Sequence, residues 1–348
     1  MRKSLQKKLM AGACVMAMTF LAACSQTTTE NSEPKMKLAQ DDSKVYVGFS
    51  LDTLQEDRWY KDKEAFEKKV LELGGEVKTL AANGVDSVQI KQAELLIAEG
   101  VDVLVVVPHN AEVSAEIVDK AHKANVKVVS YDRLIKNADV DYYISYDNKK
   151  VGQLQAQEIL KKQKKGNFAY IGGAETDNNA VLFREGAMEV LQPYIDKGDI
   201  KLVFDKYTDE WQPEIAETNM KQALKENNNN IQAVIAANDG TAGGVINALQ
   251  AIGKTIPVSG QDAEITGLKR ILAGSQTMTV YKPIQVIAED AAAIAMKAGK
   301  NEKIDTTATV NNGKNDVPSI LLDPVTVTKS NIDETVIKDK FITEDELK

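Results

Sequence analysis

Residues 103–107 read Val-Leu-Val-Val-Val and end at the polar turn Pro108-His109-Asn110. An uninterrupted apolar run bounded by a turn is typical of a parallel strand that is buried on both faces of its sheet. Helices are predicted on both sides of this strand, over Val88–Glu99 before it and Ala111–Ala124 after it. The next apolar run, Val126–Ser130, completes a strand–helix–strand unit. Such a unit predicts a parallel sheet that is covered by helices.

The same alternation continues outward from this unit in both directions along the chain. The further predicted strands are Val45–Ser50, Val77–Leu80, Tyr142–Tyr146, Phe168–Ile171, Ile200–Phe204, Ala233–Ala236, Val258–Ser259, Met278–Val280, Thr306–Val310 and Val325–Val327. The further predicted helices are Arg58–Leu73, Val151–Lys162, Ala180–Leu191, Pro213–Asn227, Thr241–Ala251, Thr266–Ala273 and Ile284–Ala298. These strands are too many for one sheet of ordinary size. We therefore expect an α/β fold of two doubly wound parallel-sheet lobes.

The N-terminal segment has the pattern of a targeting signal. Met1–Lys8 is positively charged, and the apolar stretch Leu9–Ala23 is shorter than the roughly 20 residues that a membrane-spanning helix needs. We therefore predict a secretory signal peptide over residues 1–23. It ends at Leu21-Ala22-Ala23-Cys24, which resembles a bacterial lipobox and predicts lipidation of Cys24, although an ordinary signal with an incidental Cys24 is the alternative. The polar stretch 24–43 is expected to be the lipidated cysteine followed by a flexible tether.

The composition excludes several classes of function. The chain has 348 residues and a formal net charge of −8, which disfavours binding of a nucleic-acid backbone. Its two cysteines, Cys14 and Cys24, both lie in the N-terminal segment, so we expect no disulfide, zinc cluster or cysteine nucleophile in the body. We expect His109, one of two histidines, to pack within a loop. The Gly-rich stretch 240–244 lacks a phosphate-loop ending and is predicted to allow close helix–strand packing. We also expect no metal and no cofactor.

Polar and aromatic side chains gather where the predicted strands end. In open parallel sheets this edge is where ligands bind. The candidate residues there are Arg58, Trp59, Asp132, Arg133, Asp177, Asn179, Arg184, Trp211, Asn238, Asp262 and Lys282. Carboxylates and guanidinium groups form charge-assisted hydrogen bonds with hydroxyl groups, and tryptophan rings cover the apolar faces of a sugar. The set therefore predicts a sugar-binding site.

Several of these residues also have a purely structural interpretation. Asn178 or Asn179 would serve as a helix cap, and Arg133 or Arg184 as a partner in a surface ion pair. Trp59 would serve as core packing for its own helix. The prediction of a site depends on all of these residues meeting at one place.

Read in order, the strand-end motifs resemble the D-xylose-binding group of the ribose-like (type I) solute-binding proteins of bacterial ABC sugar importers. The resemblance covers residues 44–340. It includes the segments Glu56–Trp59, Tyr131–Arg133, Tyr143–Asn148, Asp177–Ala180, Leu182–Arg184, Asn238–Asp239, Ser259–Ala263 and Gln276–Pro283.

The resemblance implies a type I periplasmic-binding-protein fold, whose two lobes are joined by a hinge of three crossings. The N-terminal lobe would comprise residues 44–148 plus 283–315, and the C-terminal lobe residues 149–282 plus 316–348. It also implies that the candidate residues are the sugar ligands, with Lys282 at a hinge crossing. D-xylose or a similar monosaccharide and a membrane permease are the implied partners of a monomeric protein. The lipobox departs from the soluble members of this family and implies anchoring to the outer face of the cell membrane.

Two other functions remain open from the sequence. A sensor would use the same fold to present its sugar to a membrane kinase or chemoreceptor. An extracellular glycosidase would use a carboxylate pair such as Asp132 and Asp262. The glycosidase is weaker, because neighbouring arginines favour the ionised form of both carboxylates.

Overall fold

The computed structural model describes residues 37–348, so the predicted signal peptide, Cys24 and most of the tether lie outside the described residues. The strands of the N-terminal lobe form one sheet, called here the N-terminal sheet, in the order β10-β11-β5-β4-β3-β1-β2. They are β1 (Tyr46–Leu51), β2 (Glu76–Ala81), β3 (Val103–Val106), β4 (Lys127–Tyr131), β5 (Tyr142–Tyr146), β10 (Ala308–Asn311) and β11 (Asp316–Leu322). All neighbours pair in parallel except β10 and β11, which form an antiparallel hairpin at the edge.

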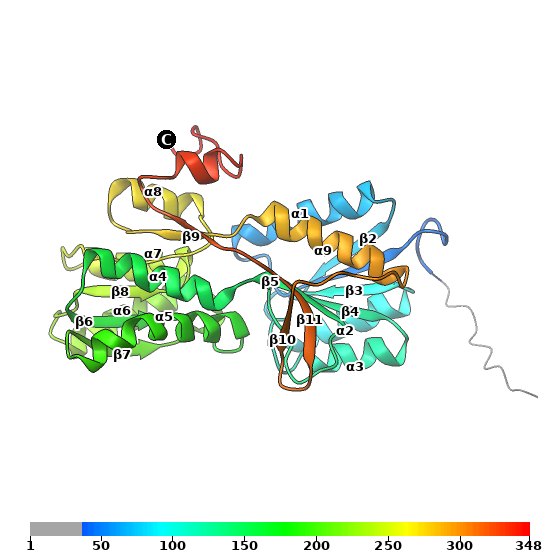
Figure 1. Ribbon diagram of the computed structural model, residues 1–348, viewed down its shortest axis with the longest axis horizontal. Helices are drawn as coiled ribbons and strands as arrows, with labels where there is room; N and C mark the ends of the chain where they lie inside the picture. The colour runs from blue at the N-terminus through cyan, green and yellow to red at the C-terminus, as the bar shows by residue number, and fades with distance from the viewer. Residues whose placement is uncertain (1–36) are drawn as a thin grey trace, which may run out of the picture. The chain divides into compact units, whose positions relative to one another are not determined.

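Helices cover both faces of the N-terminal sheet, as Figure 1 shows. They are α1 (Asp57–Glu72) and α9 (Ile284–Gly299) on one face, and α2 (Asp86–Ala98) and α3 (Ala115–Lys123) on the other. Within β3, Val103 and Val105 pack toward α1 and α9, whereas Leu104 and Val106 pack toward α2 and α3. Because successive side chains of a strand point to opposite faces, a sheet that is covered on both sides needs an uninterrupted apolar run. This explains the sequence of residues 103–107.

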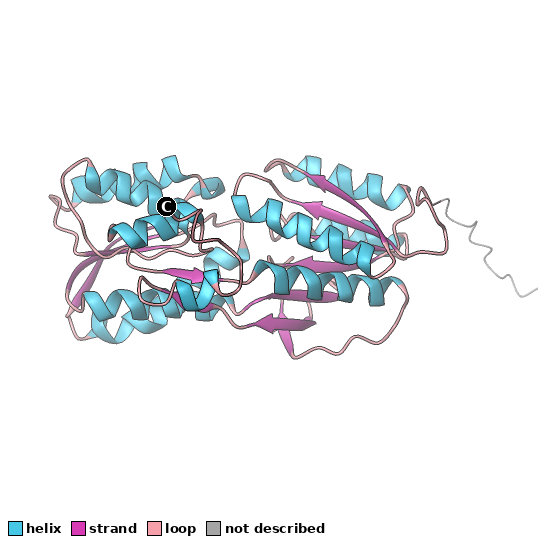
Figure 2. Cartoon of the chain, turned by 90° about the horizontal axis from the view of Figure 1, so that it is seen from above, coloured by secondary structure: helices cyan, strands magenta, loops and turns pink. Residues whose placement is uncertain are grey.

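The C-terminal lobe repeats this layered plan around a smaller sheet. The C-terminal sheet has the order β7-β6-β8 and consists of β6 (Gly166–Ile171), β7 (Ile200–Lys206) and β8 (Ala233–Ala236). Its helices are α4 (Asn148–Lys162), α5 (Asn178–Asp196), α6 (Pro213–Glu226), α7 (Asp239–Gln250) and α8 (Ile265–Ala273), with a short 3-10 turn η1 over Asp209–Trp211. Figure 2 shows helices on both sides of the strands. The expected strand at 258–259 is a single bridge between Val258 and Val234.

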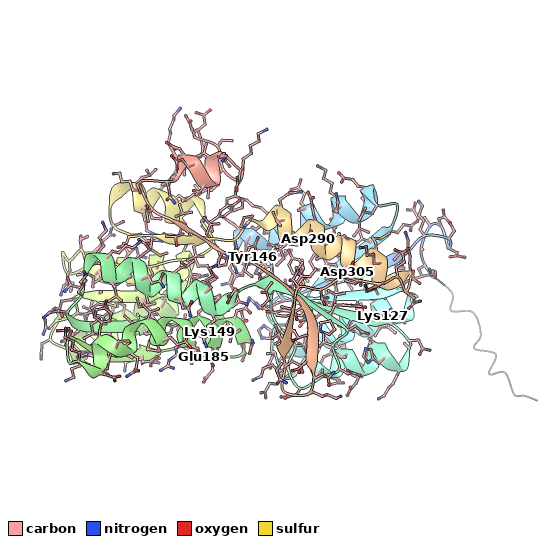
Figure 3. The ribbon with its side chains drawn as sticks, in the orientation of Figure 1. Lys127, Tyr146, Lys149, Glu185, Asp290 and Asp305 are labelled. Carbon is pink, nitrogen blue, oxygen red and sulfur yellow. The ribbon has the colours of Figure 1, made fainter. Side chains whose placement is uncertain are left out.

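Close helix contacts in the C-terminal lobe depend on glycine. A Cβ atom on Gly152 of α4 would lie 1.9 Å from the carbonyl oxygen of Phe183, and one on Gly186 of α5 would lie 1.9 Å from that of Lys149. Figure 3 labels Lys149 and Glu185 on these two facing helices. A Cβ on Gly244 would lie 2.0 Å from the carbonyl oxygen of Pro213. Close packing at residues 240–244 was expected between a helix and a strand, but here Gly244 of α7 packs against another helix, α6.

Within the described residues the chain passes between the lobes three times, from β5 to α4, from β9 (Thr279–Tyr281) to α9, and from β11 to β12 (Val325–Val327). Tyr146, labelled in Figure 3, donates its hydroxyl hydrogen to the carbonyl oxygen of Pro283 at 2.7 Å. The amide of Asp147 donates to the carbonyl oxygen of Leu322 at 2.9 Å. These two bonds tie the three crossings together.

One lobe boundary differs from the sequence expectation. The C-terminal lobe was expected to resume at residue 316, but β11 pairs in parallel with β5 from Ser319 to Leu322 and therefore belongs to the N-terminal sheet. The third crossing accordingly follows Leu322. After it, β12 pairs antiparallel with β9, and a short π-helical turn over Asp333–Ile337 packs against α8.

Candidate functional site

A cavity lies between the strand ends of the two lobes, next to the hinge. It encloses about 300 Å³ of space not occupied by protein atoms, its open mouth included. Its lining residues are Glu56, Arg58, Trp59, Asp132, Arg133, Asp177, Asn179, Phe183, Trp211, Asn238, Gln261, Asp262 and Lys282. Every candidate residue from the sequence is among them except Arg184.

Arg58, at the start of α1, is the centre of a buried charge network. Its guanidinium group lies 3.2 Å from Asp62, 3.0 Å from Asp132 and 3.5 Å from Asp262. Burial opposes its charge, but these three carboxylates outweigh burial and raise the pKa of Arg58 well above its usual range. Because Asp262 comes from the C-terminal lobe, this one side chain connects the two lobes.

Lys282 adds a second cation to the same network. Its Nζ atom lies 3.6 Å from an oxygen of Asp132 and 3.6 Å from an oxygen of Asp262. Burial opposes ionisation of Asp132, but Arg58, Lys282 and Arg133 outweigh it and lower the pKa of Asp132 to about 2. Asp132 is therefore ionised at neutral pH. It can accept hydrogen bonds from hydroxyl groups, but it cannot act as the general acid that a glycosidase requires.

Arg133 forms a second link between the lobes. Its Nε atom lies 2.8 Å from Asp177 of the C-terminal lobe, and its Nη1 atom pairs with Asp52 at the end of β1. Burial raises the pKa of Asp177, and the charge of Arg133 offsets part of that rise. The backbone between β4 and Arg133 turns at Asp132, which has a φ of 57°. Asp and Asn tolerate this left-handed conformation better than most residues.

The amide side chains of the site are fixed by local hydrogen bonds. Asp177 is the cap of α5 and accepts from the backbone amide of Asn179 at 2.9 Å. Asn179 is therefore free of the capping role, and its Nδ2 atom donates to Oδ1 of Asp132 at 3.1 Å. Asn238 caps α7, where its Oδ1 atom accepts from the backbone amide of Thr241 at 2.8 Å. That cap uses the amide oxygen and positions the side chain at the cavity.

The two tryptophans reach the cavity from opposite lobes. Trp59 packs in the core of the N-terminal lobe and also lines the cavity, where the Arg58 guanidinium lies 4.3 Å from its ring centroid. Trp211 is the last residue of the 3-10 turn η1, has a φ of 57° and meets the ring of Phe183 edge-on at 6.3 Å. A Cβ atom on Gly173 would lie 2.0 Å from the Trp211 ring, so only glycine allows this ring position.

Arg184 does not reach the cavity. It forms a partly exposed ion pair with Asp205 of β7, with 3.0 Å between its Nε atom and a carboxylate oxygen. The structure therefore places Arg184 in a surface ion pair, as in its structural interpretation, and not among the residues that line the cavity. Its neighbour Phe183 lines the cavity instead, because Phe183 lies one helical turn after Asn179 on the same face of α5.

Sequence reasoning missed three lining residues: Glu56, Phe183 and Gln261. Glu56 accepts a 2.9 Å hydrogen bond from Nε1 of Trp59, and burial raises its pKa. Helical spacing from Asn179 was the available signal for Phe183. Gln261 lies next to Asp262 in a motif that the resemblance already contained, but no chemical argument had singled it out.

His109 lies in a neighbouring cavity, behind Arg133. Its Nδ1 atom is 2.8 Å from Asp52, which also holds Arg133, and its Nε2 atom is 3.6 Å from Glu210 of the C-terminal lobe. It does not line the central cavity, in agreement with the expectation of a packing role.

Neither a metal centre nor a membrane-spanning helix occurs in the part of the chain that the structure describes. No cluster of His, Cys, Asp and Glu side chains within residues 37–348 could hold a metal ion. None of the helices in this range is both long and apolar enough to span a bilayer.

Comparison with known proteins assigns the chain to a family. The family of the periplasmic binding protein domain matches residues 47–303, which include the C-terminal sheet, most of the N-terminal sheet and all of the residues that line the cavity. The chain belongs to the periplasmic binding proteins. This periplasmic binding protein is 50% identical over 303 residues to the D-xylose-binding periplasmic protein of Haemophilus influenzae, covering 86% of this chain and 91% of that one.

Two further relatives extend this comparison. The multiple sugar-binding periplasmic receptor ChvE of Rhizobium radiobacter is 35% identical to this periplasmic binding protein, covering 87% of this chain and 92% of its own. A crystal structure of an ABC transporter solute binding protein from Clostridium phytofermentans with bound β-D-glucose matches with a TM-score of 0.82 and 32% identity. That match covers 87% of this chain and all of the other. These relatives are binding proteins, and the predicted fold class is confirmed.

Proposed function

We propose that this protein captures D-xylose between its two lobes and delivers it to an ABC importer. The observation that carries the proposal is the buried network in which Arg58 and Lys282 meet Asp132 and Asp262 between the lobes. Charged groups of both signs can bind hydroxyl groups as donors or acceptors, with the strength of charge-assisted hydrogen bonds. The 50% identity to a D-xylose-binding protein supports this sugar among the monosaccharides.

Binding of the sugar would favour the closed arrangement of the lobes. Asp132 and Arg133 come from the N-terminal lobe, whereas Asp177 and Asp262 come from the C-terminal lobe, so a sugar among them contacts both. A ligand shifts a conformational equilibrium only by its differential affinity for the two states. Contacts with both lobes exist only when the lobes are together, and they supply that difference.

Calorimetric titration with a panel of pentoses and hexoses tests the proposal. We expect D-xylose to bind more tightly than D-glucose by at least about 1.4 kcal/mol, a tenfold difference. The reason is steric: the exocyclic CH2OH group of a hexopyranose has to fit between Trp59, Trp211 and the arginines. If D-glucose or D-ribose binds more tightly, the choice of D-xylose is wrong but sugar binding stands. If no monosaccharide gives heat or changes the tryptophan fluorescence, the proposed function is wrong.

We also propose that a lipid on Cys24 anchors the protein to the outer face of the cell membrane, where it works as a monomer. The support is the sequence Leu21-Ala22-Ala23-Cys24 and the polar stretch that follows it. Membrane fractionation of the wild type and of Cys24→Ala tests the anchor. The wild type should remain with the membrane, and the variant should be soluble or unprocessed. Wild-type protein that is soluble and carries no acyl chain would refute the anchor.

A sensory role is the second candidate, because the relative in Rhizobium radiobacter is named a receptor. Both roles use the same cavity and differ in the membrane protein that contacts the lobes. Affinity purification from membranes with D-xylose present separates them: a permease indicates transport, and a kinase or chemoreceptor indicates sensing.

A further inference from the structure

Gln261 holds a buried acceptor atom that nothing in the protein satisfies. Its side chain is only 3% exposed and lines the central cavity. Its backbone carbonyl accepts from the amide of Asp239 at 2.9 Å, and its Nε2 atom donates to Oδ2 of Asp262 at 3.2 Å. The Oε1 atom has no hydrogen-bond partner among the described residues. Because the amide nitrogen is committed to a carboxylate, the free atom of the amide is the oxygen.

Trp211, which also lines the cavity from the C-terminal lobe, presents the complementary case. Its Nε1 atom is also buried and has no partner in the described part of the chain. Trp59, the tryptophan of the other lobe, instead donates its Nε1 hydrogen to Glu56. A buried polar group without a partner costs free energy, and such groups are rare in native proteins. Two residues of the C-terminal lobe that line the cavity therefore carry one unused acceptor and one unused donor.

We infer that Gln261 is a sugar-contact residue whose Oε1 atom accepts a hydrogen bond from a ring hydroxyl. The Nε1 atom of Trp211 donates a hydrogen bond to a hydroxyl of the same sugar. This inference rests on the proposed function and adds a neutral contact to the charged ones. A hydroxyl group both donates and accepts, so a sugar satisfies both unused atoms. The free atom of Gln261 can only accept a hydrogen bond, because its amide nitrogen already donates to Asp262. Gln261 therefore favours a sugar that carries a hydroxyl at the contacted position over a sugar that lacks it.

The test pairs one protein variant with a series of sugars. Gln261→Met keeps the length of the side chain and removes the acceptor. Calorimetry compares its binding of D-xylose with that of 1,5-anhydro-D-xylitol and the 2-, 3- and 4-deoxy analogues. We expect Gln261→Met to bind D-xylose roughly threefold to tenfold more weakly, as for the loss of one neutral hydrogen bond. One analogue should bind the wild type and the variant equally, because neither complex contains that bond.

Gln55→Met is the matched control, since Gln55 is an exposed glutamine at the edge of the neighbouring groove. It should leave the affinity for every sugar unchanged. The inference is overturned if Gln261→Met binds D-xylose like the wild type, which would mean that water satisfies the oxygen. The inference is also overturned if the affinity of the variant falls by the same factor for all five sugars, which would indicate a packing defect. If the wild type binds no sugar of the series, the proposed function fails as well.

Discussion

Asp132 is a buried carboxylate that connects several other groups of the candidate site. Its Oδ2 atom lies 3.0 Å from Arg58 and 3.6 Å from Lys282, and its Oδ1 atom accepts from Asn179. The side chain is 2% exposed, so these partners replace water almost completely. A buried ion loses much stability when one partner is removed, because the other charge remains buried. Ligand affinity and stability are therefore coupled at this residue.

Asp132→Asn should weaken D-xylose binding by about 1.5–3 kcal/mol, the range for hydrogen bonds to charged groups. It should also change the pH dependence of stability. The pKa of Asp132 is lowered from 3.8 to about 2 in the folded protein, so its ionisation stabilises the fold above pH 3.8 and is lost as the pH falls toward 2. Urea denaturation at pH 4 and at pH 2 should show that the wild type loses roughly 2 kcal/mol more than the variant. Equal losses in both proteins would contradict this account.

At the scale of elements, the rotation of α5 determines which of its side chains reach the cavity. Asn179 and Phe183 lie one turn apart and line the cavity, whereas Arg184 lies one residue further on and points to β7. A helix turns by about 100° per residue, so adjacent residues face different surroundings. The position on the helix therefore determines the role more strongly than the chemical type of the side chain does.

Arg184→Ala should consequently leave D-xylose binding unchanged within about 0.5 kcal/mol, as expected for an exposed ion pair. Asp262→Asn is the matched comparison at the cavity, chosen because asparagine tolerates the φ of 91° found there. It should weaken binding about tenfold or more. Titration calorimetry of the two variants side by side measures the contrast. A large loss in Arg184→Ala would restore that arginine to the ligand set.

The sequence predicts some of these elements correctly and misses others. The apolar runs at 45–50 and 103–107 predicted buried parallel strands, because covering both faces of a sheet leaves one solution for the side chains. The polar residues at strand ends predicted the site, because parallel strands end at a common edge. Strand β11 was missed as part of the N-terminal sheet, since pairing with β5 joins positions far apart in the chain. That Phe183 and not Arg184 lines the cavity could be predicted only from the rotation of the helix, because the chemical types of the two side chains favour Arg184 as a ligand.

At the scale of the whole molecule, several charge pairs connect the lobes across the cavity. Arg58 reaches Asp262, Arg133 reaches Asp177, and Lys282 lies at a crossing between them. Each pair joins one residue from each lobe or from the hinge, so none could be inferred from one lobe alone. Such contacts are available only when the strand ends of both lobes face each other.

His109 adds a titratable imidazole group to these contacts between the lobes. Asp52 at the end of β1 lies 2.8 Å from its Nδ1 atom, and Arg133 pairs with the same carboxylate. Its Nε2 atom faces Glu210 of the C-terminal lobe at 3.6 Å and Asp86 at the start of α2 at 4.0 Å. The hydrogen bond to Asp52 raises the pKa of His109 despite burial, and the charges of Asp52, Glu210 and Asp86 add to the rise. Protonation therefore strengthens a contact between the lobes.

We accordingly expect the stabilisation from His109 to be fully present below pH 6.5, its unfolded value, and to be lost as the pH rises through the higher folded pKa. NMR titration of the imidazole protons measures this directly, since the chain has only two histidines. The pKa of His109 should exceed 6.5 in the wild type and fall in Glu210→Gln, because the variant removes a facing negative charge. The His122 resonance is the internal control, because His122 pairs with Asp141 within its own lobe and does not face Glu210. An unchanged His109 pKa in Glu210→Gln would show that this contact carries no charge coupling between the lobes.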